Sequence, residues 1–136
     1  MAVKEKTLPV LIKEADDIFS TFIRLRDSDE KGIVRCFICS APLPWRQSQN
    51  MHFIDRDQMP TRYSEINCHA GCGLCNCFDM DHKNKYEVKM VVLYGASQVE
   101  ALYLKAKRSL QKFMRFELEE LIEFYSLKVK ELKAKK

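Results

Sequence analysis

The chain has 136 residues, of which 46% are hydrophobic and 31% are charged, and its formal net charge is +4. This is the composition of one ordinary globular domain, which argues against a fibrous, disordered or multidomain protein. No apolar run is long enough to cross a bilayer and the first residues lack the pattern of a signal peptide, so we expect a cytoplasmic protein. The modest positive charge permits a polyanionic partner without identifying one.

A helix is predicted over residues 8–26. Thr7 is a suitable N-cap, Pro9 fits the first turn, and apolar residues recur at helical spacing from residue 11 to residue 23. Arg24 and Arg26 lie near the C-terminal end of this helix, where cations suit the helix dipole. They are either solvated charges or contacts for phosphate groups.

Short strands are predicted in the middle of the chain. Residues 33–35 form one and residues 50–54 another, with residues 47–49 as the turn of a small hairpin. Trp45 either packs on the neighbouring cysteine turn or stacks on a nucleic-acid base, and we favour packing. A short helix is predicted to begin near Cys72 and to end before Lys85.

The rest of the chain is predicted to be helical. Gly95 suits a helix C-terminus, and residues 97–100 form a capping box that would open the next helix. Residues 133–136 are expected to form a flexible basic tail. An apolar stripe at helical spacing predicts packing on the chain's own core, although its length also allows dimerisation; it comprises Leu118, Leu121, Ile122, Tyr125, Val129 and Leu132. A basic group is either a solvated helix face or a contact for DNA phosphates; it comprises Lys105, Lys107, Arg108, Lys112 and Arg115.

Six cysteines in a cytoplasmic protein argue for metal binding over disulfides. Four of them form two Cys-x2-Cys turns, Cys36/Cys39 and Cys72/Cys75, separated by the 32 residues from Ser40 to Gly71. Two such turns complete the tetrahedron of thiolates that zinc prefers, and a site with four protein ligands is structural because it has no open position. The alternative is a set of free, buried cysteines.

The remaining cysteines and two histidines complicate the assignment of the metal ligands. Cys68 could compete with Cys72, and Cys77 with Cys75, but the Cys-x2-Cys spacing favours treating both as spare thiols. His69 and His82 remain alternative ligands.

The motifs occur in the order Cys-x2-Cys, His52-Phe53-Ile54, Asn67-Cys68-His69 and Cys-x2-Cys-Asn76. This order resembles the HNH (ββα-metal) endonucleases, in the variant whose last histidine is an asparagine. Residues 22–27, 34–39, 52–54, 61–63 and 67–69 are similar to the phage recombination protein family NinG/Rap. The layout of the cysteine turns and the asparagine is also similar to phage endonuclease VII, a Holliday-junction resolvase. The resemblance covers about residues 18–123.

The resemblance implies an α+β fold in a single domain, residues 1–136. Its centre would be a small zinc-stabilised ββα-metal core, treble-clef-like, over residues 33–85. The helix at residues 8–26 and a helical extension over residues 86–136 would flank this core.

The resemblance also implies roles for individual residues. His52 would be the general base, Asn67 would orient its imidazole, and Asn76 would bind a catalytic divalent cation such as Mg²⁺, with Asp79 as a second ligand. Many HNH enzymes carry a metal-binding residue directly before the base, where this chain has Met51. Asp55 or Asp57 could compensate.

Physical chemistry supports these roles independently of the resemblance. A neutral imidazole can act as a base near pH 7, and magnesium prefers oxygen ligands while zinc takes the sulfurs. Arg56 and Arg62 could hold a phosphate as bidentate donors, or could be surface charges. Without the neighbouring motifs, His52 would be read as a packed strand histidine with no chemical role.

We therefore expect a metal-dependent DNA endonuclease that acts on Holliday junctions or other branched DNA in phage or prophage recombination. It would work in the bacterial host, could be a homodimer, and could cooperate with other phage recombination proteins. One alternative is a non-catalytic zinc-knuckle DNA-binding module that assists a recombinase. Another is a nicking nuclease without junction preference.

Overall fold

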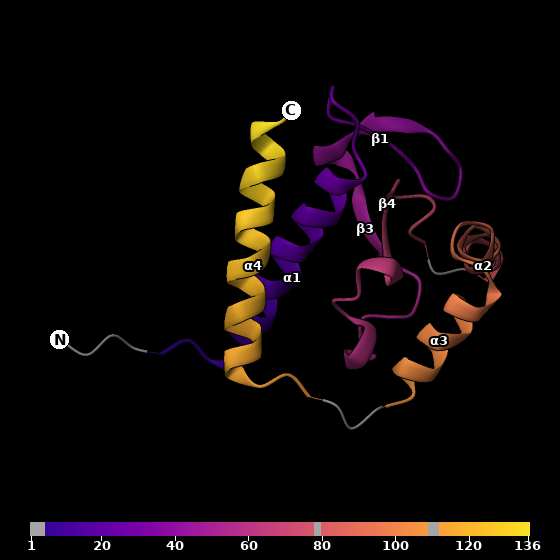
Figure 1. Cartoon of the computed structure of the whole chain (residues 1–136). Coiled ribbons are helices and arrows are strands. Elements are labelled where there is room, and N and C mark those ends of the chain that lie inside the picture. The colour runs from indigo at the N-terminus through magenta and orange to yellow at the C-terminus, as the bar shows by residue number, and fades with distance from the viewer. Residues whose placement is uncertain (1–4, 78–79, 109–111) are drawn as a thin grey trace.

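The computed structural model describes residues 5–77, 80–108 and 112–136, which form an α+β fold (Figure 1). The helices are α1 (Leu8–Arg26), α2 (Met80–Tyr94), α3 (Ala96–Ala106) and α4 (Arg115–Ala134). The strands are β1 (Ile33–Arg35), β2 (Pro42–Pro44), β3 (Gln49–His52) and β4 (Cys68–Gly71). The predicted fold class is confirmed at this level. Within the described ranges, no helix is both long and apolar enough to span a membrane.

Helix α1 has the predicted bounds, and the predicted cap is present. The Thr7 hydroxyl oxygen accepts a hydrogen bond from the Val10 N–H at 3.4 Å. Helix α1 lies beside α4, and the two run in the same direction (Figure 1). At one end of the pair the Arg115 guanidinium donates to the carbonyl of Lys6, and at the other the Lys136 ammonium donates to the carbonyl of Ser28 at 2.8 Å.

The apolar stripe of α4 packs on α1 within the same chain. The Tyr125 ring lies 5.0 Å from the Phe19 ring and 4.8 Å from the Phe22 ring, measured between centroids. Leu118 is fully buried with Leu11 and Ala15. The predicted packing is confirmed, and this stripe is therefore not available for dimerisation. The predicted basic tail is wrong, because α4 continues through residue 134 and Lys136 contacts the α1 side of the molecule.

The strands form two separate antiparallel pairs. Strand β1 pairs with β2, and β3 pairs with β4, so that His52 lies opposite Cys68 and Met51 opposite His69. The predicted hairpin turn at residues 47–49 is wrong: residues 45–47 form a short 3-10 turn, and the partner of β3 comes from residues 68–71. The two cysteine turns bring this distant segment back, which is a through-space constraint that local patterns do not contain.

Two predicted helix starts are also wrong. No helix begins at Cys72; residues 72–77 form a turn in which the Asn76 N–H donates to the Cys72 carbonyl at 3.1 Å. Helix α2 begins at Met80 and runs through Lys85 to Tyr94, so the predicted end before Lys85 is wrong as well. The predicted capping box is not formed, because α3 begins at Ala96. Gly95 alone separates α2 from α3 and has a φ of 85°, a left-handed conformation that favours glycine. It ends α2 as predicted and leaves Ser97 inside α3.

Met51 fixes which way β3 faces. Its side chain is buried in the core formed with α2 and α3, together with Phe53, Tyr86 and Met90. Because side chains alternate along a strand, Asn50 and His52 face the opposite side, where α1 lies. The half of the molecule built from residues 33–77 therefore presents His52 toward the helical half.

Candidate functional site

The four predicted cysteines converge on one point. The sulfur atoms of Cys36, Cys39, Cys72 and Cys75 all lie within 4.8 Å of one another, and those of Cys39 and Cys72 are 3.8 Å apart. Zinc–thiolate bonds of about 2.3 Å in a tetrahedron place sulfurs about 3.8 Å apart. The cluster could thus hold a metal ion such as zinc, as predicted.

The backbone around the cluster favours a thiolate. Burial by itself raises the pKa of the Cys36 thiol, but hydrogen bonds from the N–H groups of Cys39, Cys72 and Ile38 outweigh burial and lower this pKa to about 7. A thiolate is the form that binds metal. Cys68 and Cys77 lie outside the cluster, the first fully buried and the second exposed.

Gly71 allows the cluster to lie directly against the core. A Cβ atom at this position would be 2.2 Å from Cε of Met51 and 3.1 Å from Sγ of Cys36. The methionine therefore fills space beneath the sulfurs, and its side chain points away from the face that carries His52. The residue before the predicted base is a packing residue here.

His69 belongs to the core and not to the metal cluster. Its ring stacks on Phe37 at 3.9 Å between centroids. The Tyr86 hydroxyl donates its hydrogen to the Met51 carbonyl at 2.8 Å. The oxygen of this hydroxyl therefore accepts from Nδ1–H of His69 at 3.0 Å. Nε2 of His69 carries no hydrogen and accepts from the Tyr94 hydroxyl at 2.7 Å. Burial lowers the pKa of His69 to about 4, which keeps the imidazole neutral. This chain of bonds ties α2 to β3 and β4.

His52 is held by a backbone carbonyl. Its Nε2 lies 3.0 Å from the carbonyl oxygen of Arg62, so Nε2 carries the proton and Nδ1 is left as an acceptor in the neutral ring. Burial lowers the pKa of this imidazole below its usual 6.5. The ring is therefore neutral at pH 7, which is the form that a general base requires.

Asn67 is fully buried and fixes the loop behind His52. Its Oδ1 accepts from the Ile54 N–H at 2.8 Å, and its Nδ2 donates to the carbonyls of Ile54 and Thr61 at 3.0 and 3.1 Å. Between these two described residues there is no hydrogen bond from the Asn67 side chain to the imidazole. Asn67 instead positions the segment that ends at Arg62, whose carbonyl holds the ring.

A cleft of about 840 Å³ lies between α1 and β3. His52 and Asn76 both line it, although they come from different segments of the chain. Asn76 donates from Nδ2 to Oε1 of Gln49 at 2.7 Å, which leaves its Oδ1 as an acceptor. The other polar residues of the lining are Asp16, Asp17, Ser20, Arg24, Ser48, Gln49, Asn50, Asp55, Arg56, Asp57, Arg62 and Tyr63.

The donor set of the cleft suits a hard cation. Apart from Nδ1 of His52, the atoms of the lining that could bind a metal are side-chain oxygens, and the four clustered sulfurs lie in the separate cysteine site. Oδ1 of Asn50, two residues before His52 on the same face of β3, is buried without a hydrogen-bond partner among the described residues. Asp79, the predicted second ligand, lies outside the described residues.

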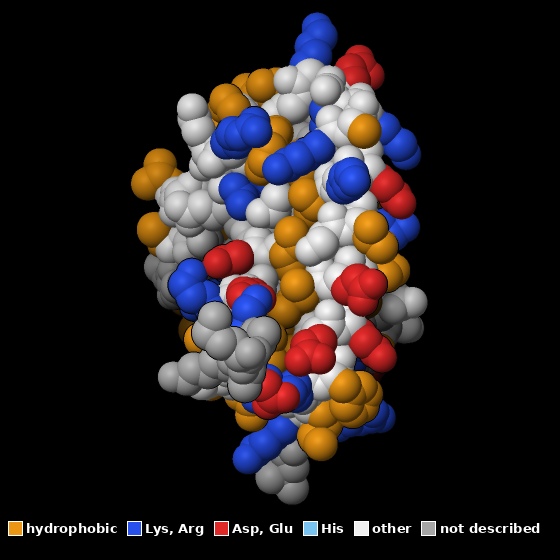
Figure 2. Space-filling view, turned by 90° about the vertical axis from the view of Figure 1, so that its left-hand side faces the viewer, with side chains coloured by type: hydrophobic (Ala, Val, Ile, Leu, Met, Phe, Trp, Pro, Cys, Tyr) orange, Lys and Arg blue, Asp and Glu red, His pale blue; other side chains and the backbone are white. Residues whose placement is uncertain are grey.

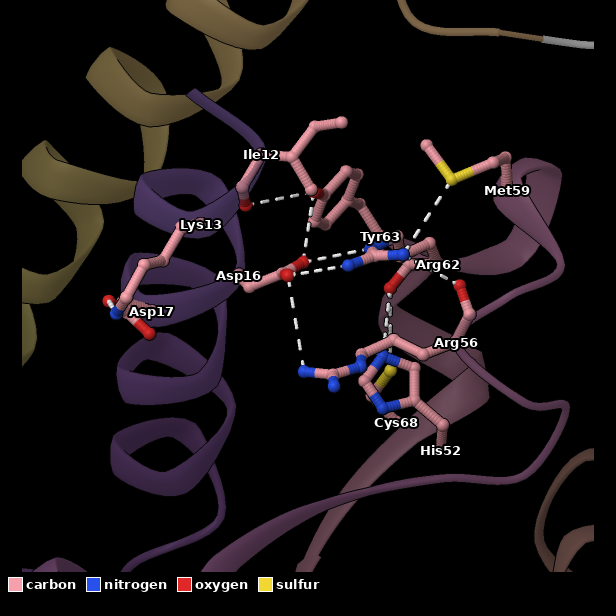
Figure 3. A network of polar contacts seen from close by, with 10 residues as sticks. All are labelled: Ile12, Lys13, Asp16, Asp17, His52, Arg56, Met59, Arg62, Tyr63 and Cys68. Carbon is pink, nitrogen blue, oxygen red and sulfur yellow. Dashed lines mark hydrogen bonds and ion pairs between the residues drawn. The ribbon is translucent and has the colours of Figure 1, made fainter. Parts of the chain in front are cut away.

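An ion pair across the cleft connects α1 to the segment that holds His52 (Figure 3). Arg62 binds both carboxylate oxygens of Asp16, with Nε–Oδ1 at 2.9 Å and Nη2–Oδ2 at 2.6 Å. The hydroxyl of Tyr63 donates to the same carboxylate at 2.9 Å, and the third donor of Arg62 reaches the carbonyl of Arg56 at 3.0 Å. The Arg62 side chain is thus engaged inside the protein.

The family model for the bacteriophage lambda NinG protein matches residues 1–135. The chain belongs to the NinG family. No curated protein and no solved structure gave a significant match. Membership of the NinG family indicates a function connected with phage recombination.

The arginines predicted to contact DNA have different surroundings in this NinG-family chain. Arg26 binds the carboxylate of Asp27 and donates to the carbonyls of Glu65 and Cys68 at 2.8 and 2.7 Å, so it stabilises the fold. The Arg56 side chain is 62% exposed and lines the cleft. Its Nη1 lies 3.9 Å from Oδ2 of Asp16, which is a loose ion pair, so its donors remain accessible from the cleft. Arg24 also lines the cleft, with its guanidinium 5.6 Å from the centroid of the Trp45 ring.

Asp16 is the site residue that the sequence did not reveal. It lies on α1, 46 residues before Arg62, and belongs to no motif. The only local indication is its place in the acidic pair Asp16-Asp17 within an otherwise amphipathic helix. Trp45 packs as predicted, but its partners belong to the cluster between α1 and α4.

Proposed function

We propose that this chain is a metal-dependent DNA endonuclease that acts in phage recombination. The observation that carries the proposal is that His52 and Asn76 line one cleft beside a cluster of four cysteines. In this account the cysteine cluster holds a zinc ion with four protein ligands, which leaves no open position for chemistry. The zinc ion would shape the cleft, and the reaction would occur beside His52.

The chain's own groups account for the hydrolytic step. Nδ1 of His52 takes a proton from the attacking water while the water oxygen bonds to phosphorus and the phosphorus–oxygen bond to the leaving group breaks. The leaving oxygen then takes a proton from solvent. The Arg62 carbonyl keeps the imidazole in the tautomer whose Nδ1 can accept. A positioned base of this kind typically contributes about 10²–10⁴ in rate.

Asn76 and Arg56 would place the substrate. Oδ1 of Asn76 would be one ligand to a Mg²⁺ ion, with Asp79 as a further ligand in the proposal. Such an ion, when bound, stabilises negative charge on the phosphate and on the leaving oxygen. Arg56 has its donors exposed at the rim of the cleft and would hold a non-bridging phosphate oxygen. Arg62 would act through its carbonyl, because its guanidinium is bound to Asp16.

The proposed substrate is branched DNA such as a Holliday junction, which rests on the resemblance to junction resolvases. Selectivity would come from DNA shape and backbone contacts, because the cations at the cleft, Arg24 and Arg56, suit phosphate oxygens. Resolution needs two cuts, and a homodimer would supply two sites. Because the α4 stripe packs on α1, such a dimer would use another surface, and light scattering would measure it.

A cleavage assay on branched and linear DNA with Mg²⁺ tests the proposal. Wild type should cut, and His52→Ala should lose about 10²–10⁴ in single-turnover rate while it still binds DNA. His82→Ala, which replaces a histidine outside the cleft lining, is the matched control and should cut normally. Added imidazole should partly restore cutting by His52→Ala.

The pH dependence of cutting gives a second measurement. The neutral form of His52 is the base, and burial lowers its pKa, so the rate should stay high below pH 6.5 and fall only as the pH passes the lowered pKa. DNA binding by wild type without any cutting would instead support a non-catalytic DNA-binding module. Equal cutting of branched and linear DNA would support a nicking nuclease.

A further inference from the structure

Three cations surround the only tryptophan of the chain, next to the cleft. The guanidinium of Arg46 lies 4.5 Å from the centroid of the Trp45 ring, that of Arg24 lies 5.6 Å away, and the ammonium of Lys133 lies 6.0 Å away. They come from α1, from the 3-10 turn at residues 45–47 and from α4. The fold thus gathers on one ring cations that are far apart in sequence. We call these four residues the Trp45 surface.

No carboxylate in the described part of the chain pairs with these three cations. None of the three cations forms an ion pair with a carboxylate among residues 5–77, 80–108 and 112–136. Arg46 and Lys133 are exposed, while Arg24 is half-buried and donates to the carbonyl of Ser20 at 3.3 Å. Like charges held close together without a counter-charge favour the binding of an anion.

The charge of the surrounding face is divided along α4. The first half of this helix carries four glutamates and one arginine, and the second half carries three lysines and one glutamate: Glu117, Glu119, Glu120, Glu123 and Arg115, then Lys128, Lys130, Lys133 and Glu131. Figure 2 shows the result: Lys and Arg side chains gather on the upper part of this face, and Asp and Glu side chains lie mainly below them. A polyanion would be attracted to the upper part and repelled from the lower part.

The Trp45 surface is continuous with the cleft. Arg24 belongs to both, and Ser48, which lines the cleft, donates its hydroxyl hydrogen to the carbonyl of Trp45 at 2.6 Å. The tryptophan ring has guanidinium groups near it and packs between helices, so it serves as a platform for cations and not for a stacked base. Guanidinium and ammonium groups fixed in this way bind phosphate oxygens.

We infer that the Trp45 surface binds the phosphate backbone of the DNA arm that leaves the cleft. This rests on the proposed function in that the cleft receives DNA. The inference adds a second point of contact, set by Arg46 and Lys133, that fixes the direction of the arm. It concerns binding alone, so it holds or fails independently of the hydrolytic step.

The salt dependence of DNA binding, measured without added magnesium, tests the inference. Labelled four-way junction and duplex DNA are titrated with zinc-loaded protein at several KCl concentrations. Each phosphate contact adds about 0.9 to the slope of log K against log[salt]. The double variant Arg46→Gln/Lys133→Gln should therefore lose about two units of slope, with an affinity loss that shrinks as salt rises.

Two control variants show whether the salt dependence follows from the position of the removed charges or only from their number. Lys105→Gln/Lys107→Gln removes the same charge from exposed positions on and next to α3 and should leave the slope within about half a unit of wild type. Arg46→Lys/Lys133→Arg keeps both charges and should behave like wild type. Trp45 is the only tryptophan, so its fluorescence should also change when DNA binds.

The outcomes distinguish this inference from the proposed nuclease. Equal slopes for the two neutralised pairs, an unchanged Trp45 emission or an absence of DNA binding would overturn the inference. A slope loss confined to the Arg46/Lys133 pair in a protein that never cuts would support the surface and contradict the nuclease. Cutting that depends on His52, with no slope loss, would support the nuclease and contradict the surface.

Discussion

The two walls of the cleft are stabilised in different ways. The wall formed by residues 33–77 has strands of three or four residues, four converging sulfurs and a few buried polar groups. The opposite, helical wall is α1, which packs on α4; the two helices have 19 and 20 residues and bury apolar stripes against each other. Short strands are only marginally stable alone, whereas long amphipathic helices stabilise one another through packing.

The two walls also differ in how specifically their buried polar groups are hydrogen-bonded. Buried polar groups in the first wall have specific partners: Asn67 bonds three backbone groups and both nitrogens of His69 are engaged. The second wall supplies area and a few directed contacts, among them the Asp16 carboxylate on Arg62 and the Arg26 guanidinium on the carbonyls of Glu65 and Cys68. The wall that carries the cysteine cluster therefore sets the geometry of the cleft, and the helical wall closes it.

Removal of the metal should have the largest effect and should act on the first wall. Cys39→Ser should lose zinc and with it roughly 10–16 kcal/mol of apparent folding free energy, because the binding energy of such a site is folding energy. Hydrogen exchange should then show residues 33–77 unprotected. Cys77→Ser, an exposed cysteine outside the cluster, should keep one zinc per chain; equal zinc content in both variants would contradict the assignment.

Truncation in the helical wall should have a smaller effect that leaves the metal in place. Leu118→Ala removes a fully buried side chain and should lower the free energy of unfolding by about 2–5 kcal/mol while the zinc content stays unchanged. Leu127→Ala on the same helix, where the side chain is 58% exposed, should change it by less than about 0.5 kcal/mol. Zinc loss in Leu118→Ala would show that the cysteine cluster and the packing of the helices do not stabilise the two walls separately.

Acid should weaken the first wall through His69. The pKa of His69 is about 4 in the folded protein, below its usual 6.5, so its contribution is complete above pH 6.5 and is lost as the pH falls toward 4. The loss over this interval is about 3 kcal/mol. Thiolates also release metal in acid, so the measurement is the difference between wild type and His69→Phe in denaturant unfolding at pH 7 and pH 5. A difference that is the same at both pH values would contradict this account.

Loss of the Asp16–Arg62 ion pair between the walls should have the smallest effect on stability. Asp16→Asn removes the charge that binds Arg62 and should cost roughly 1.5–3 kcal/mol, as expected for hydrogen bonds to a charged group. The neighbouring Asp17→Asn, in an exposed pair with Lys13, should change unfolding by less than about 0.5 kcal/mol. Asp16→Asn should also lower the pKa of His52, because the carboxylate raises it, and move the acid limb of the cleavage profile to lower pH.

Local patterns in the sequence predicted the helical wall well. The apolar spacing and the Thr7 cap predicted α1 with its observed bounds, and the stripe of α4 predicted its packing. Cysteine spacing predicted the convergence of the four sulfurs, because two Cys-x2-Cys turns are typical of a shared metal site. In these cases the cause of the structure lies within a few residues.

Contacts between distant segments were not predictable in the same way. The pairing of β3 with β4 depends on two cysteine turns 32 residues apart, and short strands carry too little pattern to identify a partner. The bond from Arg62 to Asp16 spans 46 residues and follows from the position of α1, which no motif encodes. Arg62 and Arg26 accordingly resembled phosphate ligands in the sequence, whereas the fold uses both guanidinium groups internally.

The central claim is that two different ions have separate sites, one among the sulfurs and one among the oxygens beside His52. Anomalous diffraction from a crystal of the zinc-loaded protein soaked in MnCl₂, recorded near the zinc and manganese edges, tests it most directly. The account predicts a zinc peak at the centre of the four cysteine sulfurs and a manganese peak in the cleft, on the Oδ1 side of Asn76. Manganese absent from the cleft, or zinc bound elsewhere than at the four sulfurs, would contradict it.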